Sequence, residues 1–263
     1  MATDIRKSLK KYVQIFSEAK EKNANEANTV TRIQSFFVEV LGYDLFSDVI
    51  REQRIQARFA DLEIKVDDAV KLIVEAKAAG EPLKDRHVDQ AKLYAAESNV
   101  KWVLLTNGTN WNLYYLAANE PLDFDTVFKV DLENDEIGAS AQLLGLLHKK
   151  ALRVGEHETY RKKQVALSPL SVGKALFTEA VLDVIRREIR RDGGHIIDEE
   201  DLAQSLHEMF LPDVREKMGA IRIRHRSKVR ISAIPATRFG ALPATLSVVT
   251  PPVWRSGAEL FGC

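Results

Sequence analysis

The sequence contains one cysteine, no excess of charge of either sign and no long apolar run. Cys263 is the last of 263 residues, which excludes an internal disulfide framework and a cysteine-based zinc site. The formal net charge is zero, so any binding to nucleic acid must come from a local basic patch. No apolar run approaches the ~18 residues of a membrane span, and the charged N-terminus lacks the apolar core of a signal peptide. We therefore expect a cytoplasmic protein without membrane contact.

The absence of several motifs disfavours further classes of enzyme. The six histidines show no H-x-x-x-H or other metal-ligand spacing. No G-x-S-x-G elbow is present, and no G-x-G-x-x-G follows a predicted strand. A zinc hydrolase, a serine hydrolase of that type and a dinucleotide-binding enzyme are therefore unsupported. The 45% of apolar and 29% of charged residues are ordinary for a globular protein.

Two helices are predicted at the start of the chain. Apolar residues at helical spacing indicate a first helix from Asp4 to about Lys20. A second helix follows, capped by Asn25 or Asn28, and Gly42 supplies its C-terminal stop.

After this point the pattern takes the period of a strand. Residues 60–66 alternate apolar and polar side chains, Asp67 and Asp68 form a turn, and residues 70–76 return as a second strand. A polar helix over about 84–98, a central strand in KWVLLT, a turn at Asn107–Gly108 and a strand in WNLYYL follow. We predict an α/β fold, with a mixed sheet of about five strands flanked by helices and the hairpin at its centre.

The rest of the chain is predicted to be mostly helical and then to change composition. One amphipathic helix is expected from Ala175 to Arg191, ended by Gly193–Gly194, and another from Glu199 to Phe210. We therefore divide the chain into a domain over residues 1–149 and a small helical extension over residues 150–218, which packs on that domain or mediates assembly. A basic and then proline-containing tail over residues 219–263 is expected to be poorly ordered.

Three charged residues meet at the end of the predicted hairpin. Glu75 and Lys77 share a face because strand side chains alternate, and the turn brings Asp61 beside Glu75. Two partly buried carboxylates repel each other, and a divalent cation relieves the repulsion. Mg²⁺ binds through one or two carboxylates plus phosphate oxygens, and a nearby lysine can orient a nucleophilic water. The set suits metal-assisted phosphodiester hydrolysis; the alternative is a cross-strand ion pair on a solvated sheet face.

Two other features accompany this set. Glu26 begins the second helix, where a carboxylate is mildly favoured by the helix dipole. Gln90 and Tyr94 are four residues apart and so share a face of the helix after the hairpin. Taken alone, each also fits an ordinary helix start or an ordinary amphipathic face.

In this order the features resemble a known family. The segments NEANTVTRIQSFFVEVLGYD, ADLEIKVDDAVKLIVEAK, QAKLY and LLTNGTNWNLYY resemble the opening helix, the metal-binding hairpin, the QxxxY motif and the closing strand pair of the N-terminal nuclease domain of type I restriction enzyme R subunits. That domain belongs to the PD-(D/E)xK, restriction-endonuclease-like superfamily. The resemblance spans about Asn25 to Leu116 and implies a DNA endonuclease of a restriction system that depends on Mg²⁺ (or Mn²⁺).

The resemblance also implies a role for each matching residue. Asp61 and Glu75 would ligate the metal, and Lys77 would be the catalytic lysine. Ala60 stands where the superfamily name places proline. The implied catalytic set is the two metal ligands, the lysine, an accessory acid and the QxxxY pair: Asp61, Glu75, Lys77, Glu26, Gln90 and Tyr94.

The resemblance does not extend to the ATP-driven motor of those R subunits. No G-x-x-x-x-G-K-[ST] is present, and SPLSVGKAL lacks both the first glycine and the final Ser/Thr. We therefore expect a stand-alone homologue of the nuclease domain, with DNA as its partner and other restriction-system subunits or a second copy as further candidates. Two other functions stay open: a DNA-binding or assembly protein with this fold that cleaves nothing, and an enzyme that acts on RNA or on ends.

Two basic clusters are candidate contacts for phosphate groups. The first lies on the helix predicted before Gly193 and otherwise forms a solvated helix face. The second lies in IRIRHRSKVRI, over residues 221–231, and otherwise forms an exposed strand or part of a disordered tail. The candidate residues are Arg186, Arg187, Arg190, Arg191, Arg222 and Arg224.

Overall fold

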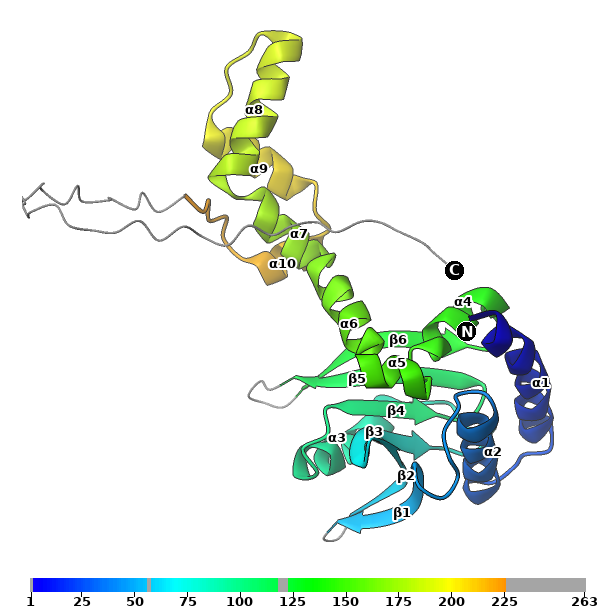
Figure 1. Cartoon of the computed structure of the whole chain (residues 1–263). Coiled ribbons are helices and arrows are strands. Elements are labelled where there is room, and N and C mark those ends of the chain that lie inside the picture. Colours follow the sequence, from blue (N-terminus) through cyan, green and yellow to red (C-terminus); the bar gives the residue numbers. More distant parts are fainter. Residues whose placement is uncertain (1, 56–57, 118–122, 226–263) are drawn as a thin grey trace, which may run out of the picture. The chain divides into compact units, whose positions relative to one another are not determined.

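The computed structural model describes residues 2–55, 58–117 and 123–225, and its elements are labelled in Figure 1. In chain order they are α1 (Ala2–Glu21), α2 (Glu26–Glu39), β1 (Val49–Ile55), β2 (Arg58–Val66), β3 (Ala69–Ala76), α3 (Asp85–Glu97), β4 (Trp102–Thr106), β5 (Asn110–Ala117), β6 (Asp123–Asp131), α4 (Ile137–Gly145), α5 (Lys149–Val154), α6 (Glu156–Ala166), α7 (Pro169–Leu176), α8 (Glu179–Gly193), α9 (Glu199–Glu208) and α10 (Pro212–Met218).

The strands form one mixed sheet, which confirms the predicted fold class. The described strands number six and follow the order β1-β2-β3-β4-β5-β6. All neighbours are antiparallel except β3 and β4, which are parallel and are joined by α3. The prediction of about five strands was therefore too low. The edge strand β1, VIREQRI, is interrupted by charged and amide residues, so it lacks the apolar alternation that marks a strand in a sequence.

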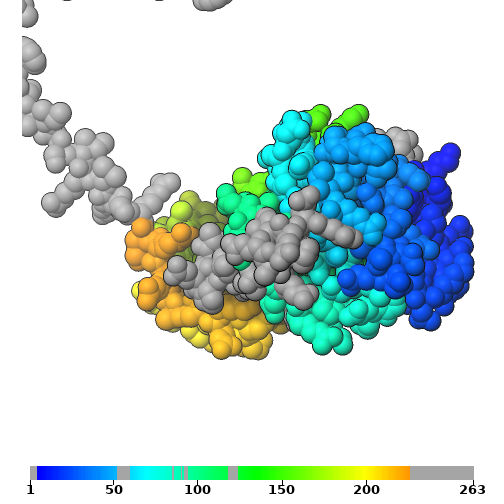
Figure 2. Space-filling model, turned by 90° about the horizontal axis from the view of Figure 1, so that it is seen from below, coloured from blue at the N-terminus to red at the C-terminus, as the bar shows by residue number. Residues whose placement is uncertain are grey.

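Helices cover both faces of this sheet. On one face, α1, α2 and α4 share a large apolar cluster with the even-numbered residues of β3, among them Leu72 and Val74. On the other face, α3 packs on Ile73 and on Val103 of β4 in a smaller cluster. In Figure 2 the residues of α1 and α2, in blue, adjoin the light-blue and cyan residues of the first strands. Burying each large apolar side chain contributes about 1.5–3 kcal/mol, which makes this two-sided core the main support of β3.

The hairpin of β2 and β3 has the tight turn that the sequence predicts. Asp67 and Asp68 both take left-handed backbone conformations, with φ of 51° and 62°. They connect the paired residues Val66 and Ala69, as in a two-residue type I′ turn. The Arg153 guanidinium pairs with the Asp67 carboxylate at 2.8 Å and ties the turn to α5. The turn sets the pairing of Lys65 with Val70, and a register shift between Ile64 and Lys65 then pairs Leu62 with Val74 and brings Asp61 level with Glu75.

The turn after β4 is buried and depends on a glycine. Gly108 has a φ of 92°, and a Cβ atom there would lie 2.5 Å from the Phe16 ring. The Asn107 side chain accepts hydrogen bonds from the backbone N–H groups of Thr109 and Asn110. The predicted turn at Asn107–Gly108 is thus confirmed, and it fixes the loop beside the end of β3.

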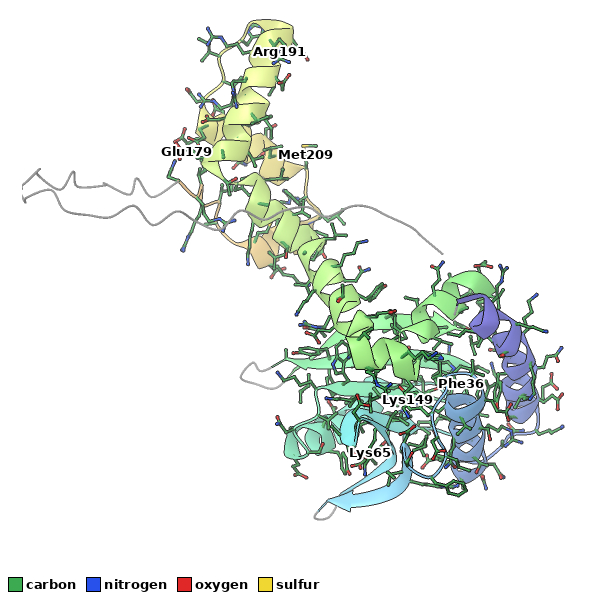
Figure 3. All side chains as sticks on the ribbon, viewed as in Figure 1. Phe36, Lys65, Lys149, Glu179, Arg191 and Met209 are labelled. Atoms are coloured by element: carbon green, nitrogen blue, oxygen red, sulfur yellow. The ribbon has the colours of Figure 1, made fainter. Side chains whose placement is uncertain are left out.

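The extension after residue 155 has a small apolar core of its own. Phe177, Leu182 and Leu202 are buried there, with partly buried residues of α8, α9 and the segment after α10 packed around them. Figure 3 shows Glu179 near the start of α8 and Arg191 near its end. The domain boundary at about residue 150 stays a prediction, because residues 1–224 group as one compact unit.

The prediction of one helix from Ala175 to Arg191 was wrong. α7 ends at Leu176, and α8 begins at Glu179. Between them Thr178 is extended and forms a parallel bridge with Arg224, and this backbone pairing interrupts the helix. Gly194 does end α8, with a left-handed φ of 72°.

The basic segment of the predicted tail falls only partly within the described residues. Ile221 and Ile223 pack against the small core of the extension, so this part is not a free arm. The tail from residue 226 onward lies outside the described residues. Within the described ranges, no helix is long and apolar enough to cross a membrane.

Candidate active site

Four of the six predicted catalytic residues meet where β3 ends: Glu26, Asp61, Glu75 and Lys77. Beyond the pair Leu62–Val74, the Ala76 backbone N–H donates to Oδ2 of Asp61 at 2.7 Å. On the other side of β3, the Lys77 N–H donates to the Thr106 carbonyl at 2.8 Å and continues the parallel pairing with β4. β3 is therefore held by β4 to its last residue, while on its other edge the Asp61 carboxylate of β2 accepts a hydrogen bond from the Ala76 N–H.

Glu75 and Lys77 form a buried pair at this end of the strand. The Lys77 ammonium donates to Oε1 of Glu75 at 2.6 Å, and the residues are only 7% and 8% exposed. The Lys77 ammonium also lies 3.6 Å from Oε2 of Glu26, the half-exposed first residue of α2. Asn25 caps α2 by accepting from the Asn28 N–H, and this fixes the position of Glu26. The alternative of an ion pair on a solvated sheet face is inconsistent with this burial.

Burial and charge strongly perturb this pair. Burial and the nearby Asp61 carboxylate raise the pKa of Glu75 to about 7, although the hydrogen bond from Lys77 opposes the shift. Burial disfavours the charge on Lys77, but its hydrogen bond to Glu75 and the surrounding carboxylates outweigh that effect and hold the pKa of Lys77 above its ordinary value. A buried carboxylate with a raised pKa beside a second carboxylate is typical of a functional site.

Tyr94 contacts a carboxylate that the sequence interpretation did not select. Its hydroxyl donates to Oε1 of Glu63 at 2.7 Å, and the two residues are 1% and 8% exposed. Burial and the bond to Glu63 raise the pKa of Tyr94, so the hydroxyl keeps its proton and donates it. Glu63 follows Asp61 by two residues, so the alternation in ADLEIKV was the signal that could have identified it. The side chain of Gln90 lies outside the described residues.

The donor set at this position fits a hard divalent cation. Asp61 and Glu75 supply carboxylate oxygens, and burial together with the Asp61 charge raises the pKa of Glu75, a cost that a bound cation would reduce. Among the described residues, no group of three or more His, Cys, Asp or Glu side chains is arranged to hold a metal ion. A Mg²⁺ ion at this site would therefore take its remaining ligands from water and substrate, as Mg²⁺ commonly does.

The predicted basic clusters lie on the helical extension. Arg186 and Arg191 on α8 pair with the carboxylates of Asp183 and Glu188. Arg224 donates to the backbone carbonyl of Lys174. Within the described ranges, no hydrogen bond or ion pair joins these arginines to the set at the end of β3.

The comparison with known families agrees with the resemblance found in the sequence. Residues 25–125 match the family model described as Type I restriction enzyme R protein N terminus (HSDR_N). Neither the curated proteins nor the solved structures contain a match to the chain. The matched segment runs from the cap of α2 into β6 and includes every residue of the predicted catalytic set. The segment that carries the predicted catalytic set is therefore similar to the N-terminal region of type I restriction enzyme R proteins.

Proposed function

We propose that the chain is a Mg²⁺-dependent endonuclease that hydrolyses phosphodiester bonds of DNA. One observation supports the proposal most directly. Asp61, Glu75 and Lys77 converge at the end of β3, with the lysine bonded to one buried carboxylate and the other carboxylate fixed by a backbone N–H. The family match, which comes from restriction enzymes, supports DNA as the substrate.

The chain's own residues have distinct tasks in this proposal. Asp61 and Glu75 hold the cation, which when bound polarises the scissile phosphate and lowers the pKa of a coordinated water. Lys77 is charged and directed by Glu75, so it can orient the attacking water or stabilise charge that develops on the phosphate. Glu26 lies beside the lysine and balances its charge from α2.

Glu63 and Tyr94 support this set without taking part in the reaction. Their buried hydrogen bond joins α3 to β2, two residues from Asp61. Because a carboxylate without a donor is costly in such a place, the pair favours one arrangement of helix and strand. In this way α3 would keep Asp61 aligned with Glu75.

The experiment is incubation of the purified chain with supercoiled plasmid and linear duplex DNA, with Mg²⁺ or Mn²⁺ and with a chelator. We expect nicking or linearisation of the plasmid that requires the metal. Asp61→Asn, Glu75→Ala and Lys77→Ala should each abolish it. The matched control is an exposed pair in which Lys11 donates to Glu39 at 2.9 Å, and Glu39→Gln should retain full activity.

The outcomes separate the proposal from its rivals. DNA binding without cleavage under any metal would show a binding or assembly protein and would contradict the proposal. Cleavage of RNA but not DNA, or of linear but not circular DNA, would contradict the stated substrate or the internal mode of attack. Metal-dependent cleavage that survives in both Glu75→Ala and Lys77→Ala would contradict the assigned site.

A further inference from the structure

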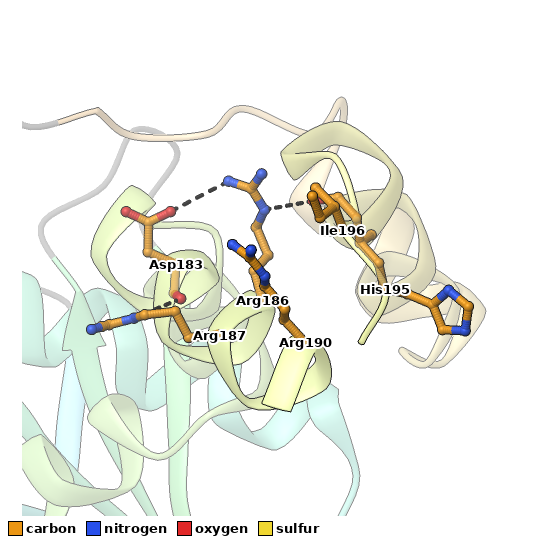
Figure 4. A pocket seen from close by; sticks show the side chains of 7 residues that line it. Asp183, Arg186, Arg187, Arg190, His195 and Ile196 are labelled. Atoms are coloured by element: carbon orange, nitrogen blue, oxygen red, sulfur yellow. Dashed lines mark hydrogen bonds and ion pairs between the residues drawn. The ribbon is translucent and has the colours of Figure 1, made fainter. Parts of the chain in front are cut away.

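A hollow on the helical extension is lined by three arginines of α8 and four other residues. It has a volume of about 500 Å³ and is formed by one face of α8 and by the segment that follows this helix. Figure 4 shows that the arginines come from the helix, whereas His195, whose imidazole points away from them, and Ile196 come from that segment. The lining residues are Asp183, Arg186, Arg187, Arg190, His195, Ile196 and Ile197.

Arg186 shapes the hollow. Its Nε–H donates to the Ile197 carbonyl at 2.7 Å, and one of its terminal nitrogens lies 3.4 Å from Oδ1 of Asp183. These bonds fasten the segment after Gly194 to α8 and account for one arginine and the single carboxylate of the hollow. Arg186 is thus a structural cation with both of its contacts within the extension.

Arg187 and Arg190 have no acidic partner within the described residues. Among the described residues, the Arg187 side chain forms one hydrogen bond, from its Nε–H to the Asp183 carbonyl, and the Arg190 side chain forms none. Both residues are exposed. By contrast, Arg191 lies 2.7 Å from Oε2 of Glu188. Two neighbouring arginines of one helix face therefore present uncompensated guanidinium groups.

We propose that this hollow binds the phosphate backbone of duplex DNA through Arg187 and Arg190. The choice of DNA rests on the proposed function, because the substrate of the proposed nuclease carries a row of phosphate groups, which exposed guanidinium groups bind. The two arginines are three residues apart, or ~4.5 Å along the helix axis. Both guanidinium groups lie at the ends of long exposed side chains, so they can reach neighbouring phosphates of one strand. Guanidinium groups bind phosphate oxygens in bidentate fashion, and such contacts position DNA without reading its sequence.

A purely structural explanation for these arginines is that cations near a helix C-terminus stabilise its dipole. This effect is confined to the last turn and is shared by Arg191, which faces Glu188. It therefore predicts that Arg190 and Arg191, which lie in that turn, affect stability to a similar degree, and that Arg187 has no such effect. The proposed site predicts instead that Arg187 and Arg190 affect DNA binding, whereas Arg191 does not.

The test is fluorescence anisotropy of a short labelled duplex of arbitrary sequence, with the full chain in chelator so that no cleavage occurs. The variant that combines Arg187→Gln and Arg190→Gln is compared with Arg191→Gln, and thermal unfolding checks that both fold. Loss of two phosphate contacts should reduce the slope of log K against log salt by about two. Between about 50 and 200 mM salt, the wild type should lose about 10-fold more affinity than the double variant.

Several results would overturn this inference. They are an unchanged salt slope in a folded double variant, an equal loss in Arg191→Gln, no binding of duplex by the wild type, and competition by polyglutamate as strong as by unlabelled DNA. If DNA binding depended on Arg187 and Arg190 but the chain cleaved no DNA, the proposed phosphate-binding role of the hollow would be supported and only the proposed nuclease activity would be contradicted. If the chain cleaved DNA but binding did not depend on these two arginines, the nuclease activity would be supported and the role of the hollow would be contradicted.

Discussion

Replacing Glu75 by glutamine should stabilise the metal-free protein at alkaline pH. The folded-state pKa of Glu75 is about 7, against an ordinary value of 4.5, because the residue is buried beside Asp61. The folded protein therefore holds this proton more tightly than the unfolded chain does. Consequently the free energy of unfolding decreases as pH rises from about 4.5 through about 7, and the full cost of the charge is present only above that range.

The size of this effect follows from the shift. A difference of about 2.5 pKa units corresponds to about 3 kcal/mol at ~1.36 kcal/mol per unit. Glutamine has the same shape and can still accept the hydrogen bond from Lys77, but it cannot pair with the lysine's charge. We therefore expect the Glu75→Gln variant to be more stable than wild type by about 1–3 kcal/mol near pH 8 and nearly equal to it near pH 4.

The assay is urea unfolding of both proteins in chelator at these two pH values. Glu39→Gln is the matched control, because the hydrogen bond from Lys11 lowers the pKa of the exposed Glu39, and its replacement should have the opposite sign at alkaline pH. If Glu75→Gln were less stable than wild type near pH 8, the attraction to Lys77 would outweigh burial and the repulsion from Asp61. The reasoning that assigns this site to a cation would then be refuted.

Three other replacements test separate parts of the structure. Lys77→Met should lower the cleavage rate in single-turnover assays by about 100-fold or more, and calorimetry should show unchanged binding of Mn²⁺. Loss of metal binding in this variant would contradict a role of Lys77 in the chemical step. Tyr94→Phe should lower the free energy of unfolding, measured in urea, by about 1–3 kcal/mol because Glu63 loses its hydrogen-bond donor. A double-mutant cycle with Glu63→Gln should show that the two replacements are coupled. Additive effects would contradict the hydrogen bond between Tyr94 and Glu63. Gly108→Ala should lower the free energy of unfolding by more than ~1 kcal/mol, and so the thermal midpoint, because Gly108 has a positive φ and a Cβ atom there would meet the Phe16 ring. An unchanged midpoint would contradict the requirement for glycine in this turn.

Much of the sheet could be predicted because its local signals agree with its tertiary environment. The hairpin had an alternating strand, a pair of aspartates able to adopt positive φ, and an apolar returning strand. Each signal depends on neighbours in the sequence, so the hairpin and its turn could be predicted from it. The register shift between Ile64 and Lys65, which brings Asp61 level with Glu75, was not predicted. The edge strand β1 was missed because its charged residues hide any periodicity.

Features that depend on distant contacts could not be read in this way. The break at Thr178 coincides with backbone pairing to Arg224, 46 residues later. The local signal, a threonine followed by Glu179 at a helix start, is weak and was overlooked. The four arginines of α8 looked equivalent in the sequence. Their separation into paired and uncompensated groups depends on Asp183, Glu188 and the path of the chain after Gly194. In the same way, the partner of Tyr94 became evident only once α3 was placed over β2.

The most direct test of the account is the initial rate of plasmid nicking by the wild type and by Asp61→Asn, measured side by side in Mg²⁺ and in chelator. The asparagine side chain could still accept the hydrogen bond from the Ala76 N–H, so the hairpin should persist while one charge of the cation site is lost. The account predicts metal-dependent nicking by the wild type and none by a folded Asp61→Asn variant. Equal rates for the two proteins, or a wild-type rate that chelator leaves unchanged, would contradict it.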